Sequence, residues 1–224
     1  MLQNMKIGSR KWQAIIEEGV GKLDIKINRD HVEKLSQYAV ELYKWNQKVN
    51  LTAIIDPLEA AVKHFVDSLV PAAALETGSS LIDIGTGGGF PGIPIKILRP
   101  SIKVVLVDSS RKKVNFLKHI IRITRLAQTE AIHARAEDLA KDDAFAGYFD
   151  IAICRAFSSV DHFVSLALPL LKKRKGTMIA MKGKKKEDFQ FLHTCDEYDF
   201  EIQKSTYTLP FINSERTIIK IRTV

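Results

Sequence analysis

The sequence predicts a doubly wound α/β sheet that is preceded by a helical N-terminal region. From Ser80 onward, short apolar runs alternate with amphipathic segments, which is the pattern of buried parallel strands joined by helices. Before that point the apolar residues recur at helical spacing. A glycine-rich segment, residues 85–92, follows the first apolar run, at the place where a doubly wound sheet carries its ligand loop.

Helical spacing dominates the N-terminal region. A first helix is predicted from Asp30, which forms a capping-box pattern with Glu33, to about Gln47. Its apolar positions are Val32, Leu35, Ala39, Leu42 and Tyr43. A second helix is predicted to start at Asp56, with Pro57 at the first helical position. Its apolar stripe comprises Leu58, Ala61, Val62, Phe65, Val66 and Leu69.

The remaining chain predicts the strands and helices of the sheet. Buried parallel strands are expected at 80–84, 103–107, 131–134, 149–154 and 176–181, with helices such as 111–123 and 159–171 between them. Two closing strands are expected at 207–209 and 217–221. No linker or low-complexity stretch divides the chain, so the helical region, 1–75, and the sheet domain, 76–224, are expected to pack together as one unit.

Composition and charge narrow the class of protein. The chain has 224 residues, 46% of them hydrophobic, which is enough for a full core. The chain has 34 Lys and Arg residues against 26 Asp and Glu residues, a net charge of +8. This positive charge favours a polyanionic partner, and a solvated basic surface is the alternative. The sequence has no apolar run long enough to span a bilayer and no apolar signal-peptide core, so a cytoplasmic protein without membrane contact is expected. Cys154 and Cys195 form no C-x-x-C pair, so reduced thiols and no metal site are expected.

A carboxylate beside the glycine loop indicates which ligand the loop holds. Residues 87–92 fit the pattern G-x-G-x-x-G, but Asp83 would repel the pyrophosphate of a dinucleotide. The ammonium and sulfonium of S-adenosylmethionine would instead be attracted, by roughly 4 kcal/mol at about 4 Å and an effective dielectric of 20. A methyl-donor loop is therefore predicted, and a turn without a ligand is the alternative. Replacing Asp83 with alanine is expected to abolish cofactor binding and leave the fold nearly intact.

The ends of the second and third strands carry candidate nucleoside contacts. Asp108 follows Gly85 by 23 residues and is placed to accept hydrogen bonds from ribose hydroxyls, or to cap the helix that starts near Arg111. Segment 134–138 follows the third strand, where a backbone N–H and a carboxylate would read the adenine edge.

The ends of the fourth and fifth strands carry basic residues. Arg155 occupies the position where amine methyltransferases often have a (D/N)-P-P-(Y/F) tetrapeptide, so a target other than an amine, or an anion, is expected. The fifth strand ends at Lys182-Gly183, with one basic run before it and one after it. The RNA-binding residues predicted from these runs are Lys172, Lys173, Arg174, Lys184, Lys185 and Lys186, and a solvated face is the alternative.

Several segments together resemble one known family over nearly the whole chain. They are L-Y-K-W-N-Q-K-V-N-L-T at 42–52, H-F-V-D-S-L at 64–69, D-I-G-T-G-G-G-F-P-G-I-P at 83–94, V-D-S at 107–109, R-A-E-D at 135–138, Arg155-Ala156 and Lys182-Gly183. The chain resembles the bacterial small-subunit ribosomal RNA guanine-N7 methyltransferases, the GidB or RsmG family. The resemblance implies a class I S-adenosylmethionine-dependent methyltransferase with a Rossmann-like sheet. It also implies a guanine in the decoding-centre loop of 16S rRNA as the target, so free rRNA or the small ribosomal subunit is the expected partner.

The resemblance also implies site residues. Matched by motif, Gly85, Phe90, Ala136, Glu137 and Arg155 would contact the cofactor. Together with the loop and ribose arguments, the expected cofactor-binding residues are Asp83, Gly85, Gly87, Phe90, Asp108, Ala136, Glu137 and Arg155. Cys154 departs from the family pattern, in which serine is expected before Arg-Ala, and a thiol makes weaker hydrogen bonds than a hydroxyl.

The chemistry implied by the family needs no general base. Guanine N7 has an in-plane lone pair and no proton, so the task of the enzyme is to align N7, the methyl carbon and sulfur. Arg155 and Lys182 are the candidate catalytic residues, and Asn46, Asn50, His64, Asp67 and Lys182 are candidates for positioning the guanine. Arg155 is expected to matter more for activity than for stability, since it ends a strand at the ligand edge. A monomer is expected.

Three alternatives remain open from the sequence. A nicotinamide oxidoreductase would use the same Asp108 but has no reason for Asp83. A non-catalytic RNA-binding or assembly factor would keep the cofactor fold without transferring a methyl group. A small-molecule methyltransferase has no need of the basic runs.

Overall fold

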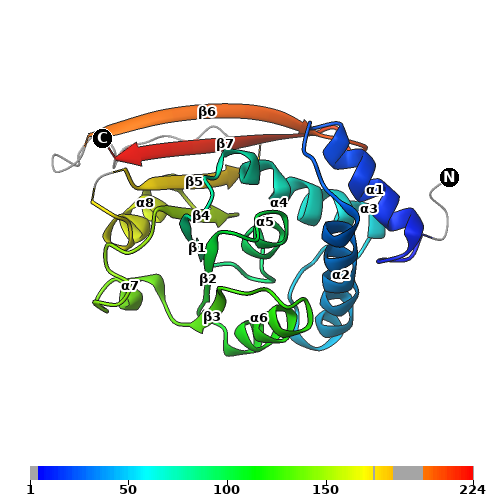
Figure 1. Ribbon diagram of the computed structural model, residues 1–224, viewed down its shortest axis with the longest axis horizontal. Helices are drawn as coiled ribbons and strands as arrows, with labels where there is room; N and C mark the ends of the chain where they lie inside the picture. The colour runs from blue at the N-terminus through cyan, green and yellow to red at the C-terminus, as the bar shows by residue number, and fades with distance from the viewer. Residues whose placement is uncertain (1–4, 174, 184–198, 224) are drawn as a thin grey trace.

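The computed structural model describes residues 5–173, 175–183 and 199–223 and is built on a seven-stranded sheet (Figure 1). The spatial order of the strands is β3-β2-β1-β4-β5-β7-β6. The strands are β1 (Ser80–Ile84), β2 (Lys103–Asp108), β3 (Thr129–His133), β4 (Ile151–Arg155), β5 (Thr177–Lys182), β6 (Phe200–Leu209) and β7 (Ser214–Thr223). The first five are parallel, and β7 pairs antiparallel to both β5 and β6. The doubly wound sheet predicted from the sequence is thereby confirmed.

The two closing strands are far longer than the sequence predicts. Each has ten residues and they pair along their whole length, from Phe200 with Thr223 to Leu209 with Ser214. Most of β6 is exposed to solvent and carries polar side chains, so it has little of the apolar alternation by which strands are recognised. Only the last residues of β6, where the strand becomes buried, were therefore recognised as a strand from the sequence.

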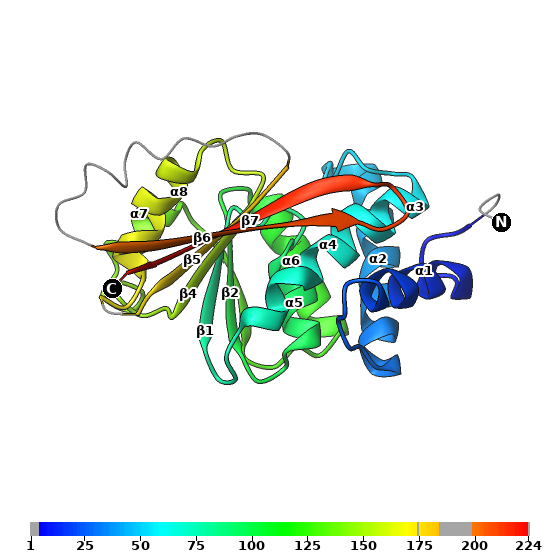
Figure 2. The ribbon, with the colours of Figure 1, turned by 90° about the horizontal axis from the view of Figure 1, so that it is seen from above.

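Helices cover both faces of the sheet (Figure 2). On one face lie α7 (Ala136–Leu139) and α8 (Val160–Ala167), which continues as a 3₁₀ turn, Leu168–Leu170. On the other face lie α5 (Gly92–Leu98) and α6 (Arg111–Ile123), whose bounds match the predicted helix 111–123. The sequence analysis missed α5 and α7 because both are short and begin inside loops.

The helical region begins with two long helices. The first, α1 (Arg10–Gly21), has no counterpart in the prediction, and the second is α2 (Arg29–Val49). The predicted capping box is wrong, because α2 is capped by Asn28, whose Oδ1 accepts from His31 N at 2.9 Å. Asp30 lies inside the first turn and pairs with Lys34.

The second predicted helix exists but changes its winding three times. Asp56 caps it as predicted, accepting from Glu59 N at 2.8 Å. The chain then passes from α3 (Pro57–Glu59) into a π-helix (Ala60–Val66), α4 (Asp67–Leu69) and a 3₁₀ turn (Val70–Ala74). The π-helix is rare and recurs at functional sites, and here it carries His64.

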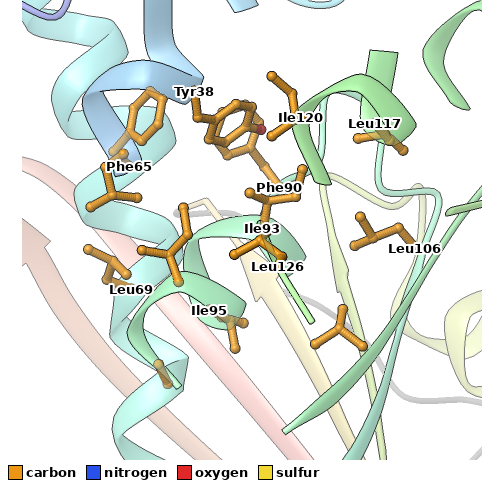
Figure 3. Close-up of a cluster of buried hydrophobic side chains, with 14 of the residues drawn as sticks. Tyr38, Phe65, Leu69, Phe90, Ile93, Ile95, Leu106, Leu117, Ile120 and Leu126 are labelled. Carbon is orange, nitrogen blue, oxygen red and sulfur yellow. The ribbon is translucent and has the colours of Figure 1, made fainter. Parts of the chain in front are cut away.

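One hydrophobic cluster joins the helical region to the sheet domain. Aromatic side chains from four helices and the glycine loop meet there, and Figure 3 shows Tyr38, Phe65 and Phe90 with Leu117 and Ile120. The ring centroids of Tyr38 and Phe90 are 5.2 Å apart in a stacked arrangement. Helix α2 therefore packs on α5 and α6, whereas α1 packs on α2 and the π-helix, and all of them share one core. Among the helices in the described ranges, none is long and apolar enough to cross a membrane.

Candidate active site

The candidate site lies at the carboxyl edge of the sheet, where the parallel strands end. Winding reverses between the neighbours β1 and β4, and open α/β sheets bind ligands beyond this point. Asp83 lies in β1 one residue before its end, and Gly85 to Gly87 follow the strand. Asp108 ends β2, Arg155 ends β4 and Lys182 ends β5. The sequence prediction that these groups meet at one edge is confirmed.

Asp83 is fully buried under the glycine loop. Its Oδ2 accepts hydrogen bonds from Thr86 Oγ1 at 2.6 Å and from Gly92 N at 2.8 Å. Its Oδ1 has no hydrogen-bond partner among the described residues. Burial raises the pKa of this carboxyl to about 6, although the bonds from Thr86 and Gly92 N oppose the shift. Asp83 thus organises the loop as well as carrying charge, so its replacement with alanine should also disturb the loop.

Gly85 is the exposed residue of the loop. Its φ of +68° lies in the left-handed region, which disfavours residues with a Cβ. A Cβ at this position would come within 3.3 Å of Phe157 Cε2, which belongs to the loop after β4. The turn therefore presents bare backbone to the carboxyl edge, beside an aromatic ring.

The carboxylate of Asp108 accepts hydrogen bonds from backbone N–H groups on both sides of β2. Its Oδ2 accepts from Gly87 N at 2.9 Å and its Oδ1 accepts from Ser110 N at 2.8 Å. Ser110 is the N-cap residue of α6, so the alternative that Asp108 caps this helix is wrong. Asp108 therefore ties the glycine loop to the start of α6.

The remaining predicted cofactor residues differ in their exposure. Ala136 is buried at the start of α7, whereas Glu137 beside it is exposed at the carboxyl edge. Phe90 is 5% exposed and packs in the core, with its ring stacked against His64 at 4.6 Å. The structure thus leaves Glu137 open to a ligand and places the Phe90 ring behind the loop.

Tyr38 contacts the glycine loop from the hydrophobic core. It is fully buried and its hydroxyl donates to the carbonyl of Gly88. We expect Tyr38→Phe to lower the free energy of unfolding by about 1–3 kcal/mol, because a buried carbonyl loses its partner. Urea denaturation measures the change. Tyr43→Phe, on the exposed face of the same helix, is the control and should leave stability within about 0.5 kcal/mol. Equal stabilities for the two variants would contradict this role.

Arg155 points into the helical region. Its Nη1 donates to the carbonyl of Lys63 at 2.7 Å and its Nη2 donates to His64 Nδ1 at 3.1 Å. The guanidinium also lies 4.9 Å from the centre of the Phe90 ring, within cation–π range. Arg155 therefore fastens the end of β4 to the π-helix, and this bonding was not visible in the sequence.

His64 is held in one neutral tautomer. Because Nδ1 accepts from Arg155, the proton belongs on Nε2, which lies 2.7 Å from Thr52 Oγ1. Burial, with Arg155 and Lys63 nearby, lowers the pKa of His64 to about 3. His64 is therefore an uncharged link between Arg155 and the loop that follows α2.

Asp67 contacts side chains of β4 and of the two closing strands, β6 and β7. Tyr207 Oη donates to its Oδ1 at 2.7 Å, and Arg216 Nε lies 3.7 Å from the same oxygen. Arg155 Nη1 lies 3.6 Å from its Oδ2. Burial raises the pKa of Asp67, and these three partners oppose the shift. Tyr207 and Arg216 were missed because their pairing depends on the register of the closing strands.

The other candidates for positioning the guanine have structural bonds. Asn46 exchanges two hydrogen bonds with the backbone of Thr52, at 2.9 and 2.8 Å, which explains the W-N-x-x-x-N-L-T string. Asn50 ends α2 in the left-handed conformation and is exposed. Lys182 is 9% exposed, and its Nζ donates to the carbonyl of Phe157 at 2.7 Å. Lys182 therefore orders the loop after β4.

The described residues of the two basic runs lie at opposite ends of β5. Lys172 and Lys173 precede β5 and Lys182 ends it, so a strand of six residues, about 20 Å long, separates them. Lys172 pairs with Asp150 at 2.6 Å at the amino edge. Lys172 and Lys173 therefore lie at the far end of β5 from the candidate site. Arg174, Lys184, Lys185 and Lys186 lie outside the described residues.

Comparison with known proteins finds a matching family model and similar proteins over most of the chain. A family model described as "rRNA small subunit methyltransferase G" matches residues 31–219. A protein of that name from Geobacter metallireducens is 42% identical over 208 residues, covering 92% of this chain and 93% of its own length. Another, from Caldanaerobacter subterraneus, is 38% identical over 214 residues, covering 94% and 89%.

Solved structures are similar in fold. A SAM-dependent methyltransferase from Aquifex aeolicus superposes with a TM-score of 0.56 at 15% identity, covering 82% of this chain and 98% of its own. TYW2 from P. horikoshii, solved in complex with MeSAdo, gives a TM-score of 0.54 at 15% identity, covering 70% and 61%. At these identities the likeness establishes the class I methyltransferase fold alone.

Proposed function

We propose that this chain, which belongs to the rRNA small subunit methyltransferase G family, transfers a methyl group from S-adenosylmethionine to N7 of a guanine in the decoding-centre loop of 16S rRNA. Membership of the family makes the chain a methyltransferase, which removes the nicotinamide oxidoreductase from the alternatives. The cofactor, the target atom and the residues that bind them form the proposal.

The choice of cofactor is supported by one observation, the unpaired Oδ1 of Asp83 beneath the glycine loop. A buried carboxylate with a free oxygen suits a ligand that brings positive charge and disfavours a pyrophosphate. The exposed turn at Gly85 offers backbone with no side chain in the way. When bound, S-adenosylmethionine supplies an activated methyl group on a positively charged sulfur.

The residues at the carboxyl edge of the sheet have different roles in the proposed site. We assign the ribose to Asp108 and the adenine edge to Glu137 and the backbone of Ala136, because these groups follow neighbouring strands. Lys182 fixes the loop between β4 and α8 at the carbonyl of Phe157, beside Gly85, and Arg155 fastens the end of β4 to the π-helix.

No general base is needed for this reaction. Guanine N7 carries no proton, and the neutral His64 is bonded at both ring nitrogens. The catalytic contribution is positioning of N7 against the methyl carbon, an effect worth roughly 7–11 kcal/mol in favourable cases. The target guanine must come from a loop, because N7 of an A-form helix lies in a deep, narrow groove.

The function is tested by methyl transfer to defined RNA. The protein is incubated with labelled S-adenosylmethionine and either unmodified 16S rRNA or unmodified 30S subunits, and 7-methylguanosine is mapped. One modified guanine in the decoding-centre loop is the expected result. Label at another atom or site overturns the assignment of the target, and no label in either RNA favours a non-catalytic RNA-binding factor.

Gly85→Val is expected to reduce S-adenosylmethionine affinity at least tenfold. Valine is strained at a φ of +68°, and its Cβ would press on Phe157. Isothermal calorimetry measures the affinity, and circular dichroism shows whether the variant folds. Gly21→Ala is the control, since nothing lies within 4 Å of the added Cβ. Unchanged affinity in a folded Gly85→Val protein would remove Gly85 from the site.

A further inference from the structure

We propose that the outer face of α6 is a docking surface for the RNA backbone. The surface is the basic stripe, which we define as Arg111, Lys118 and Arg122, all exposed on this helix. Their spacings of seven and four residues correspond to two turns and one turn, so they lie in one row. Asn115, also exposed, fills the gap in that row, and the exposed Lys112 and Arg125 flank it.

No acidic side chain of α6 neutralises the positive charge of the basic stripe. Helix α6 contains no Asp or Glu, and no residue of the stripe forms a salt bridge within the described part of the chain. Lys118 and Arg122 are four residues apart, where like charges repel and destabilise a helix. Arg122 lies 3.4 Å from Nδ1 of His119. The Nε2 of that histidine pairs with Glu41 of α2 at 2.9 Å, so the acid nearest to this part of α6 is paired with His119. Such a row gains free energy only when a negatively charged partner covers it.

The basic stripe starts beside the candidate site. Arg111 is the first residue of α6, and the loop before it is held by Asp108, which also binds the glycine loop. From there the stripe runs about 17 Å along the helix. An RNA strand that presents a base at the carboxyl edge can therefore continue along α6 with its phosphates near the three cations.

The opposite side of α6 argues for RNA over a membrane. Its apolar residues Val114, Phe116, Leu117 and Ile120 are buried in the core. An interfacial membrane helix needs a free apolar face to insert between lipids, and α6 has none. Phosphate recognition by exposed Arg and Lys, in contrast, needs only the outer face.

This inference rests on the proposed function, and the variants are chosen to separate the two. The test protein carries Arg111→Gln, Lys118→Gln and Arg122→Gln, which keep helix propensity. The control protein carries Arg10→Gln, Lys11→Gln and Lys26→Gln, three exposed residues of the N-terminal region, and loses the same charge. KM and kcat for 30S subunits, affinity for 16S rRNA between 50 and 200 mM salt, cofactor affinity and urea stability are measured for each.

The stripe variant should bind 16S rRNA about 10- to 100-fold more weakly at roughly 0.1 M salt, and its log–log salt slope should fall by about 2. KM should rise while kcat and cofactor affinity stay unchanged. Stability should be equal to or greater than that of the wild type, because the repulsion within α6 is relieved. Loss of stability would show a structural role and overturn the inference.

The other outcomes are also decisive. Equal weakening in the control variant would show an effect of net charge and overturn the inference, as would an unchanged RNA affinity. Loss of binding to phosphatidylglycerol vesicles without loss of rRNA affinity would assign the surface to a membrane instead. If the wild type transfers no methyl group, the proposed function fails, and direct binding of the two variants to 16S rRNA still decides the docking surface.

Discussion

Replacing Arg155 with alanine is expected to lower the free energy of unfolding by about 3–5 kcal/mol and to reduce methyl transfer sharply. The loss removes two hydrogen bonds, to the Lys63 carbonyl and to His64, and the cation nearest to Asp67 Oδ2. Removing one partner of a buried ion pair costs this much because the other charge stays buried. This expectation corrects the sequence-based view that Arg155 matters more for activity than for stability.

A second variant identifies the cause of the loss. Asp67→Asn in the Arg155→Ala background removes the uncompensated carboxylate and should restore about 1–2 kcal/mol. The pH dependence gives an independent check. The pKa of Asp67 is raised by burial and should rise further without Arg155, so the deficit of the single variant should grow as pH increases through that pKa. Wild-type stability in Arg155→Ala would show that the bonds of Arg155 contribute nothing.

Asp83→Asn is expected to weaken S-adenosylmethionine binding about thirtyfold. A charge interaction of roughly 2 kcal/mol corresponds to this factor. Asparagine can still accept from Gly92 N, so the loop should keep its shape, whereas alanine removes the acceptor for Gly92 N and Thr86 as well. 5′-Methylthioadenosine, which lacks both cationic groups, is the control ligand and should bind the wild type and the asparagine variant equally. An equal loss for both ligands would indicate a damaged loop instead of a charge effect.

The same variant should change how stability depends on pH. The pKa of Asp83 is about 6 in the folded protein against 3.8 normally, so its contribution to stability falls as pH rises through this range. The stability of the wild type relative to Asp83→Asn should therefore fall by about 3 kcal/mol between roughly pH 4 and 6. The lowered pKa of His64 acts in the opposite direction in both proteins. Urea denaturation at a series of pH values measures the difference, and a constant difference would contradict the raised pKa.

The sheet was predictable because its strands are short, apolar and bounded by turns. The five parallel strands, β1 to β5, agree with prediction to within two residues at each end, and α6 agrees at both ends. The hairpin of β6 and β7 was predicted at a fraction of its length, because solvent covers most of β6. The π-helix at Ala60–Val66 has no signal in residue spacing, since its apolar positions also fit an α-helix.

The site was predictable as a set of residues and not as a set of contacts. Asp83, Gly85 and Asp108 follow from the strand ends, which the winding of the sheet brings together. The partners of Arg155 lie about 90 residues earlier in the chain, and the Tyr207 bond of Asp67 joins positions 140 residues apart. No local pattern encodes such long-range pairing, so it required the structure.

The partners of the Asp67 carboxylate determine when its contacts can form during synthesis of the chain. Its partners Tyr207 and Arg216 lie on the last two strands, whereas Asp67 itself leaves the ribosome early in synthesis. Contacts of such high sequence separation form late, because a long loop must close before they gain free energy. A nascent chain that stops before β6 would therefore lack two of the three side chains that offset the burial of Asp67. The region around Asp67 should therefore reach its full stability only after β6 and β7 have formed.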